Sequence, residues 1–136
     1  GIFNRGSLEV TMPKRRIAYL KKKHGGRLPQ MGTNPCGEII LQSKQFCNLS
    51  EVIARQNDTE ASLVRKAKIA ALLGTYQSTL TKFQYLSKEW TENCNEERLL
   101  GVSITGQWDS PAVRNAKTMQ KMRDAAVKEN AFFSNE

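Results

Sequence analysis

The sequence is poor in histidine and cysteine, and neither is arranged as a metal site. His24 is the only histidine among 136 residues, and the three cysteines, Cys36, Cys47 and Cys94, include no CxxC pair. A zinc ion would therefore lack ligands at close spacing, and we expect no protein-ligated metal. An odd number of cysteines also argues against a secreted disulfide framework. The thiols are expected to be free, redox-active or buried, in a reducing cytoplasm.

Long apolar segments are missing as well. No apolar run approaches the roughly 20 residues that a membrane-spanning helix needs, and Gly1 to Arg5 lack the basic-then-apolar pattern of a signal peptide. We therefore expect a cytoplasmic protein with no membrane partner. The composition, 39% hydrophobic and 25% charged, is typical of a globular domain. Because the sequence does not begin with Met, we expect a partial domain, 1–136, incomplete at both ends.

Acidic residues are outnumbered, with 13 Asp and Glu against 21 Lys and Arg. A third of the basic residues lie within 14 positions: Lys14, Arg15, Arg16, Lys21, Lys22, Lys23 and Arg27. Such a cluster is typical of a solvated helix face, but it can also bind polyanions. A basic nucleic-acid-binding module is therefore the alternative reading, although no helix-turn-helix, zinc-finger or aromatic stacking signature accompanies the cluster.

The order of apolar patterns predicts an α/β fold. We expect a helix around 8–23, a loop over 30–38, and strands beginning at 39–41 and within 45–54. A turn and a helix cap are expected at 57–60, followed by a helix over 60–82 and a polar helical or loop segment over 90–98. A glycine-bounded apolar run predicts a strand over 99–106, and Ser110-Pro111 is expected to open the last helix. Strands that alternate with helices favour parallel pairing. The broad apolar stripe of the long helix predicts burial on more than one side. Two or three strands do not complete a sheet, so a slice of a larger α/β domain is expected.

The segment Asn34-Pro35-Cys36-Gly37-Glu38 concentrates chemical groups in a loop. Residues at alternate positions of an extended loop can face one side, so Asn34, Cys36 and Glu38 could converge on one small molecule. A thiol can act as nucleophile or hydrogen-atom donor, a carboxylate as base, and an amide can hold a hydroxyl. A tight turn with a buried cysteine and a backbone-capping glutamate is the structural alternative.

This motif resembles the finger loop of ribonucleotide reductases. A second cysteine follows Cys36 by eleven residues, within Phe46-Cys47-Asn48-Leu49-Ser50-Glu51-Val52. The pair of motifs is similar to the adenosylcobalamin-dependent enzymes, in the monomeric branch that reduces ribonucleoside triphosphates. Weaker similarity to that branch extends over most of the chain, in Gly1–Arg5, Gly37–Leu49, Leu72–Thr81 and Glu97–Gly106.

The resemblance implies a fold and a set of roles. The chain would be part of a ten-stranded α/β barrel, with the finger loop at about 30–42. Cys36 would carry the thiyl radical that abstracts the hydrogen at C3′ of the ribose. Glu38 would be the general base on the 3′-hydroxyl, Asn34 would hold the ribose hydroxyls, and Cys47 would be one of two thiols that reduce C2′. Residues that contact adenosylcobalamin are not assigned.

The resemblance also implies binding partners, and it implies that this chain lacks a thiol that the reaction needs. The substrate would be a ribonucleoside triphosphate, the effector a deoxynucleotide and the reductant a thioredoxin-type protein, with no nucleic-acid partner and a monomeric complete enzyme. The thiol that pairs with Cys47 would lie upstream of this sequence, because Cys94 stands in the unrelated polar segment Glu92–Glu96. We therefore expect this chain to be inactive by itself. An inactive reductase remnant is a further alternative, against which the intact set of motif residues argues.

Overall fold

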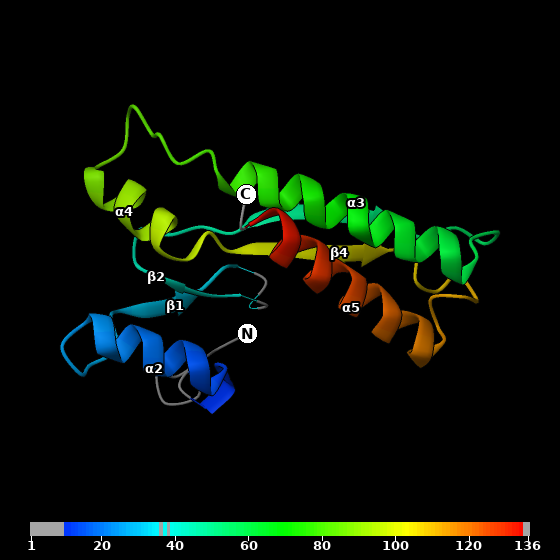
Figure 1. Ribbon diagram of the computed structural model, residues 1–136, viewed down its shortest axis with the longest axis horizontal. Helices are drawn as coiled ribbons and strands as arrows, with labels where there is room; N and C mark the ends of the chain where they lie inside the picture. Colours follow the sequence, from blue (N-terminus) through cyan, green and yellow to red (C-terminus); the bar gives the residue numbers. More distant parts are fainter. Residues whose placement is uncertain (1–9, 36, 38, 135–136) are drawn as a thin grey trace. The chain divides into compact units, whose positions relative to one another are not determined.

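The protein is mixed α/β and divides into two compact units. The computed structural model describes residues 10–35, 37 and 39–134. The first unit comprises residues up to 46 together with 82–97, and the second comprises 47–81 together with 98–136. The elements are α2 (Lys14–Lys23), β1 (Met31–Thr33), β2 (Ile40–Gln42), β3 (Asn48–Ile53), α3 (Glu60–Ser78), α4 (Lys88–Glu97), β4 (Leu100–Thr105) and α5 (Ala116–Phe133). Figure 1 labels all of them except β3.

The second unit has a β–α–β–α order, with β3 and β4 paired in parallel. The register runs from Asn48 opposite Leu100 to Ile53 opposite Thr105, which confirms the expected parallel pairing. Helix α3 contacts both strands and α5. The Ser50 hydroxyl donates a 2.8 Å hydrogen bond to the Ala70 carbonyl and so links β3 directly to α3.

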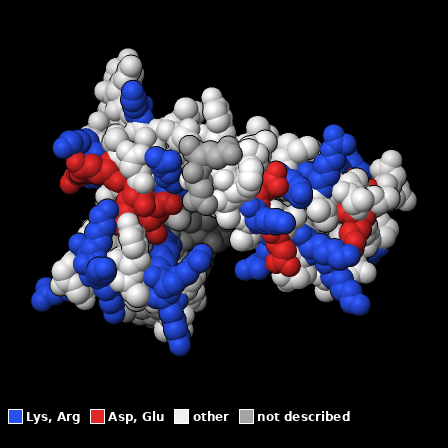
Figure 2. Space-filling view, viewed as in Figure 1, with Lys and Arg blue, Asp and Glu red and all other residues white. Residues whose placement is uncertain are grey.

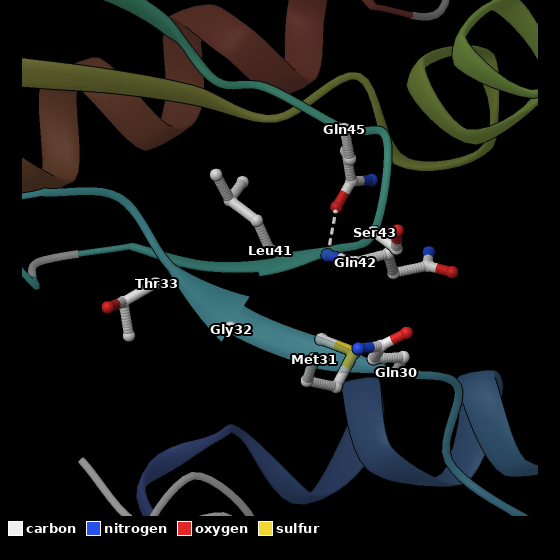
Figure 3. A pocket seen from close by; sticks show the side chains of 8 residues that line it. All are labelled: Gln30, Met31, Gly32, Thr33, Leu41, Gln42, Ser43 and Gln45. Carbon is white, nitrogen blue, oxygen red and sulfur yellow. Dashed lines mark hydrogen bonds between the residues drawn. The ribbon is translucent and has the colours of Figure 1, made fainter.

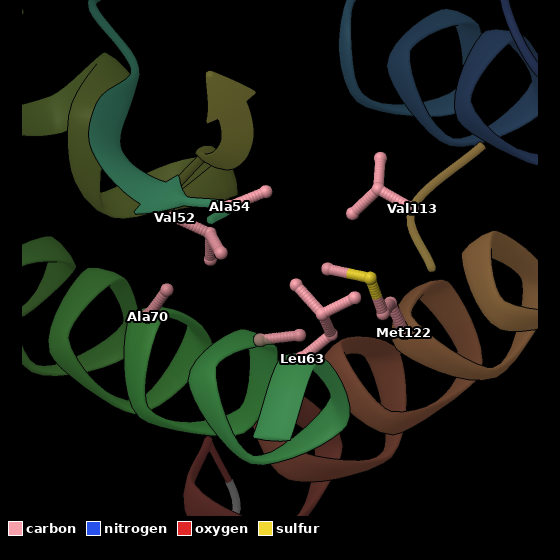
Figure 4. Packing of buried hydrophobic residues seen from close by; sticks show 7 residues of the cluster. Val52, Ala54, Leu63, Ala70, Val113 and Met122 are labelled. Atoms are coloured by element: carbon pink, nitrogen blue, oxygen red, sulfur yellow. The ribbon is translucent and has the colours of Figure 1, made fainter. Parts of the chain in front are cut away.

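A small apolar core joins the sheet of this unit to its helices. Its buried members come from β3 and the residue that follows it, from α3, from α5 and from the turn before α5. They are Val52, Ala54, Leu63, Ala67, Ala70, Val113 and Met122 (Figure 4). Helix α3 begins at a capping box, because the Thr59 side chain accepts a hydrogen bond from the Ser62 amide and the Ser62 side chain accepts one from the Thr59 amide. The cap predicted around 57–60 is confirmed, since such reciprocal bonds satisfy two amides that the helix leaves without a partner.

Each layer of the second unit buries one face only. On β3, Asn48 and Val52 are buried while Leu49 and Ile53 are about half exposed. On α3 the residues of the opposite face, Ile69, Leu73 and Tyr76, are also exposed. The prediction that α3 is buried on more than one side is confirmed only in part, because α3 contacts both the strands and α5 while the face that carries Ile69, Leu73 and Tyr76 is exposed.

The first unit is built from α2, the β1–β2 hairpin and α4. Strands β1 and β2 are antiparallel, with Met31 opposite Gln42 and Thr33 opposite Ile40. Phe46 packs edge-to-face on Phe83 at 5.1 Å between ring centroids and lies 6.0 Å from Trp90 of α4. Of the interval 8–23 expected to be helical, residues 10 and 11 and α2 at 14–23 are helical, and residues 8 and 9 lie outside the description. The helix is interrupted at Met12 and Pro13, because Pro13 stands at the N-cap of α2 with an extended ψ of 132°.

Two expected elements differ from the structure. The sequence predicts a loop over 30–38, but Met31–Thr33 form β1, since β2 offers them a pairing partner. The last helix does not open at Ser110-Pro111. It begins at Ala116, where the Asn115 side chain accepts a hydrogen bond from the Lys117 amide. Residues 110–115 form turns that place Val113 in the core. The described strands make two two-stranded sheets, so the ten-stranded barrel stays a prediction.

Candidate active site

The described residues of the motif, Asn34, Pro35 and Gly37, lie between β1 and β2. The Asn34 amide donates to the Ile39 carbonyl at 3.3 Å and extends the strand pairing by one step. The Gly37 amide then donates to the Asn34 carbonyl at 3.0 Å and closes a turn. Gly37 has a φ of +83°, in the left-handed region that glycine adopts without steric cost. The expected strand beginning at 39–41 is confirmed by β2, whereas the finger loop predicted at about 30–42 stays a prediction.

The Asn34 side chain stabilises the loop that contains it. Its side-chain oxygen accepts a hydrogen bond from the Ile39 amide at 3.1 Å, a contact that spans the tip of the hairpin. The family resemblance assigns the Asn34 side chain to the ribose hydroxyls. In this structure its oxygen also forms a hydrogen bond with the loop backbone. Cys36 and Glu38, the predicted radical cysteine and general base, lie outside the described residues, so their predicted roles stay predictions.

Cys47 directly precedes strand β3 and is partly exposed. Its thiol lies 3.8 Å from the Asn48 carbonyl. Strand alternation assigns it the same side as Leu49 and Ile53, the exposed side of the sheet. Cys47 belongs to the second unit and Asn34 to the first, so the convergence of these two predicted site residues also stays a prediction.

Cys94 is a buried thiol of the first unit. It lies on α4 and is only 6% exposed. Burial raises the pKa of this thiol, and the backbone hydrogen bond from Phe46 offsets the rise only in part. A raised pKa leaves little thiolate near neutral pH, and thiolate is the reactive form. The structure thus gives Cys94 the environment of a core residue.

A buried polar cluster that sequence reasoning missed holds β2 to its neighbours, and we call it the Glu97 cluster. It consists of Arg16 of α2, Gln42 of β2, Glu97 of α4, and Gln45, which lies between β2 and β3. The Arg16 guanidinium donates hydrogen bonds to both carboxylate oxygens of Glu97, at 2.6 and 2.9 Å. The side-chain amides of Gln42 and Gln45 each donate to the same carboxylate at 3.1 Å. Burial raises the pKa of Glu97, but these hydrogen bonds and the Arg16 charge lower it by more.

A shallow cavity of about 260 Å³ opens on the hairpin and is lined only by first-unit residues. Figure 3 shows Gln45 reaching over β2 to accept the hydrogen bond of the Gln42 amide, at 2.9 Å. The lining mixes amide and apolar side chains: Gln30, Met31, Gly32, Thr33, Leu41, Gln42, Ser43 and Gln45. This volume is below the range of about 300–1,000 Å³ typical of pockets for drug-sized ligands. Adenosylcobalamin is larger than such ligands, so this cavity does not fit it.

Basic residues are not confined to one stripe. Figure 2 shows Lys and Arg over much of the visible face, interspersed with acidic side chains. Within the basic cluster, Arg16 pairs with Glu97 and Lys23 with Glu96, while Lys117 and Lys128 belong to α5 in the other unit. The structure therefore adds nothing specific in favour of a nucleic-acid module.

The comparisons with known proteins identify no relative. No family model, curated protein or solved structure matches the chain. Among the described residues, no group of three or more His, Cys, Asp or Glu side chains could hold a metal ion. None of the helices that the structure describes has the length and apolar character needed to cross a membrane.

Proposed function

We propose that this chain is part of an adenosylcobalamin-dependent ribonucleotide reductase that converts ribonucleoside triphosphates to 2′-deoxyribonucleoside triphosphates. The observation that carries the proposal is the sequence Asn34-Pro35-Cys36-Gly37-Glu38 followed, eleven residues after Cys36, by Cys47. The hairpin supports it, because the pairing of its two strands brings the chain on either side of the motif together.

The proposal extends to the fold. In an α/β barrel, helices cover the outside of a parallel sheet and the other face of each strand looks inward. The second unit has the corresponding asymmetry, since α3 covers one side of parallel β3 and β4 while Leu49, Glu51 and Ile53 of the other side are exposed. In the proposed barrel that exposed side is the interior, and Cys47 stands at the start of the strand that lines it.

The chemistry assigned to this chain follows from the thiols and the carboxylate. Bound adenosylcobalamin supplies the one-electron oxidation of a thiol, and no described residues are assigned to hold it. The Cys36 thiyl takes the hydrogen atom from C3′, forming an S–H bond, while Glu38 accepts the 3′-hydroxyl proton. The 2′-hydroxyl leaves as water with a proton from one thiol of the pair formed by Cys47 and a second thiol, and the other thiol gives its hydrogen to C2′. The pair becomes a disulfide and passes the remaining electron to the sugar, and Glu38 returns its proton to the 3′ oxygen. Cys36 then returns the hydrogen atom to C3′. A pocket that excludes water protects such a radical.

Two cysteine variants of the complete enzyme test the assignment. Cys36→Ser should abolish reduction and hydrogen abstraction, because an O–H bond is too strong to give up its hydrogen to the cofactor radical. Cys47→Ser should still allow radical formation but block normal turnover. Full activity in the Cys36→Ser enzyme would reject the proposal, whereas salt-dependent DNA binding without any reduction would favour the nucleic-acid alternative.

A further inference from the structure

The Glu97 cluster is placed to control the hairpin that carries the motif. Arg16 donates a third hydrogen bond, from Nη1 to the Ile40 carbonyl of β2, at 2.8 Å. Gln45 accepts from the Gln42 amide and donates from Nε2 to the Asn93 carbonyl of α4, at 3.1 Å. The backbone of β2 is thus held at two points, Ile40 and Gln42, by side chains that Glu97 orients. Ile40 lies only two residues after Glu38.

The position of Glu97 is unfavourable for helix stability alone. It is the last residue of α4, where the partial negative charge of the helix end disfavours a carboxylate. Its side chain is only 7% exposed, and a buried charge costs free energy unless charged and hydrogen-bonding partners compensate it. Arg16, Gln42 and Gln45 provide that compensation, and each of them lies outside α4. The carboxylate therefore serves contacts with α2 and β2 rather than its own helix.

We propose that Glu97 is a positioning residue, which with Arg16 fixes β2 and thereby the direction in which residues 34–38 are presented to the ribose. This inference rests on the proposed function of the motif. Glu97 touches no reacting atom in this account and acts only through the hairpin. Since displacing a reacting group by about 1 Å can reduce a rate about a hundredfold, loss of the cluster should appear in kcat.

A neighbouring carboxylate provides a matched control. Glu96 is also buried on α4, at 3% side-chain exposure, and its carboxylate lies 3.1 Å from Lys23 Nζ and 3.6 Å from His24 Nε2. No hydrogen bond joins it to β1 or β2 within the described residues. Glu96→Gln thus removes a buried charge from the same helix without touching the hairpin.

The test has a structural and a kinetic readout. The amide of Gln42 donates to the Gln45 side chain, and that of Ser43 donates to the Gln30 carbonyl at 3.0 Å. In the 136-residue chain, Glu97→Gln should make these two amides exchange with solvent about tenfold faster, the effect of losing one good hydrogen bond, while Glu96→Gln leaves them unchanged. In the complete enzyme, Glu97→Gln should lower kcat about 10- to 100-fold with little change in KM, and Glu97→Asp should recover part of the loss because it keeps the charge. If Glu97→Gln does not fold, Glu97→Asp is measured at the same amides.

The outcomes separate the two proposals. Equal acceleration of hairpin exchange in both Gln variants, or none in Glu97→Gln, would overturn the positioning role. Equal kcat losses for Glu96→Gln and Glu97→Gln would also overturn it. An unmodified complete enzyme that reduces no ribonucleotide would instead overturn the proposed function, and selective exchange at Gln42 and Ser43 would still show that Glu97 holds the hairpin.

Discussion

Two glycines of the second unit should respond in opposite directions to the same substitution by alanine. Gly106 follows β4 and has a φ of +73°, and a Cβ added there would lie 2.3 Å from the Ala54 carbonyl oxygen. Gly74 lies inside α3, and its added Cβ would lie 3.5 Å from the Leu100 side chain, an ordinary van der Waals distance. The backbone at Gly106 therefore requires glycine, whereas that at Gly74 accepts alanine.

The expected magnitudes follow from these contacts. A non-glycine residue in the left-handed region costs about 1–2 kcal/mol, and the clash with Ala54 should break the 2.9 Å bond from the Ala54 amide to the Thr105 carbonyl, which is worth about 1 kcal/mol. Gly106→Ala should thus destabilise the protein by about 2–3 kcal/mol. Gly74→Ala should stabilise it by up to about 1 kcal/mol, the difference in helix propensity between the two residues.

Urea unfolding followed by circular dichroism measures both effects. Each variant should shift the midpoint without changing the dependence of the unfolding free energy on urea, since the surface exposed on unfolding is the same. A Gly106→Ala protein as stable as the unmodified chain would refute the close approach of residue 106 to Ala54. A decrease of more than about 1 kcal/mol in the unfolding free energy of Gly74→Ala would show that the backbone at Gly74 lies closer to Leu100 than the 3.5 Å found for its added Cβ.

Two further variants test other parts of the second unit. Thr59→Ala removes the cap of α3 and should cost about 1 kcal/mol in urea unfolding, whereas Thr79→Ala, beyond the other end of the helix, should cost less; equal losses would contradict the capping role. The Asp58 pKa is lowered to about 2, first by hydrogen bonds from Lys66 and Ser62, so its stabilisation is present above the unfolded pKa of 3.8 and lost as the pH falls through about 2. Unfolding followed against pH should show this loss in the unmodified chain and not in Asp58→Asn; identical profiles would refute the lowered pKa.

Local signals in the sequence predicted much of the second unit. The cap at Thr59, the apolar positions around Leu63 and the glycine-bounded run at Leu100 each reflect contacts within a few residues or with an adjacent layer. Parallel pairing of β3 with β4 followed from the strand–helix–strand order. The start of the last helix was misplaced because Ser110-Pro111 is an equally good turn, and burial of Val113 favours the turn.

The Glu97 cluster had no signal in the sequence. Arg16 and Glu97 are 81 positions apart, and each reads by itself as a charged residue on a helix surface. Their pairing depends on how α2, β2 and α4 pack together, and the spacing of apolar residues along the sequence does not predict that packing. The exposed side of α3 was missed for a related reason, since an apolar pattern marks positions that favour burial but not whether a partner surface is present.

Reduction of a ribonucleotide labelled with deuterium at C3′ tests the central claim most directly. The complete enzyme, given adenosylcobalamin and a dithiol, should form the 2′-deoxynucleotide, more slowly from the deuterated substrate than from the unlabelled one, because the Cys36 sulfur must break the C3′–H bond. The Cys36→Ser enzyme should form none. Reduction that continues in Cys36→Ser, or an unmodified enzyme that forms no deoxynucleotide, would contradict the account.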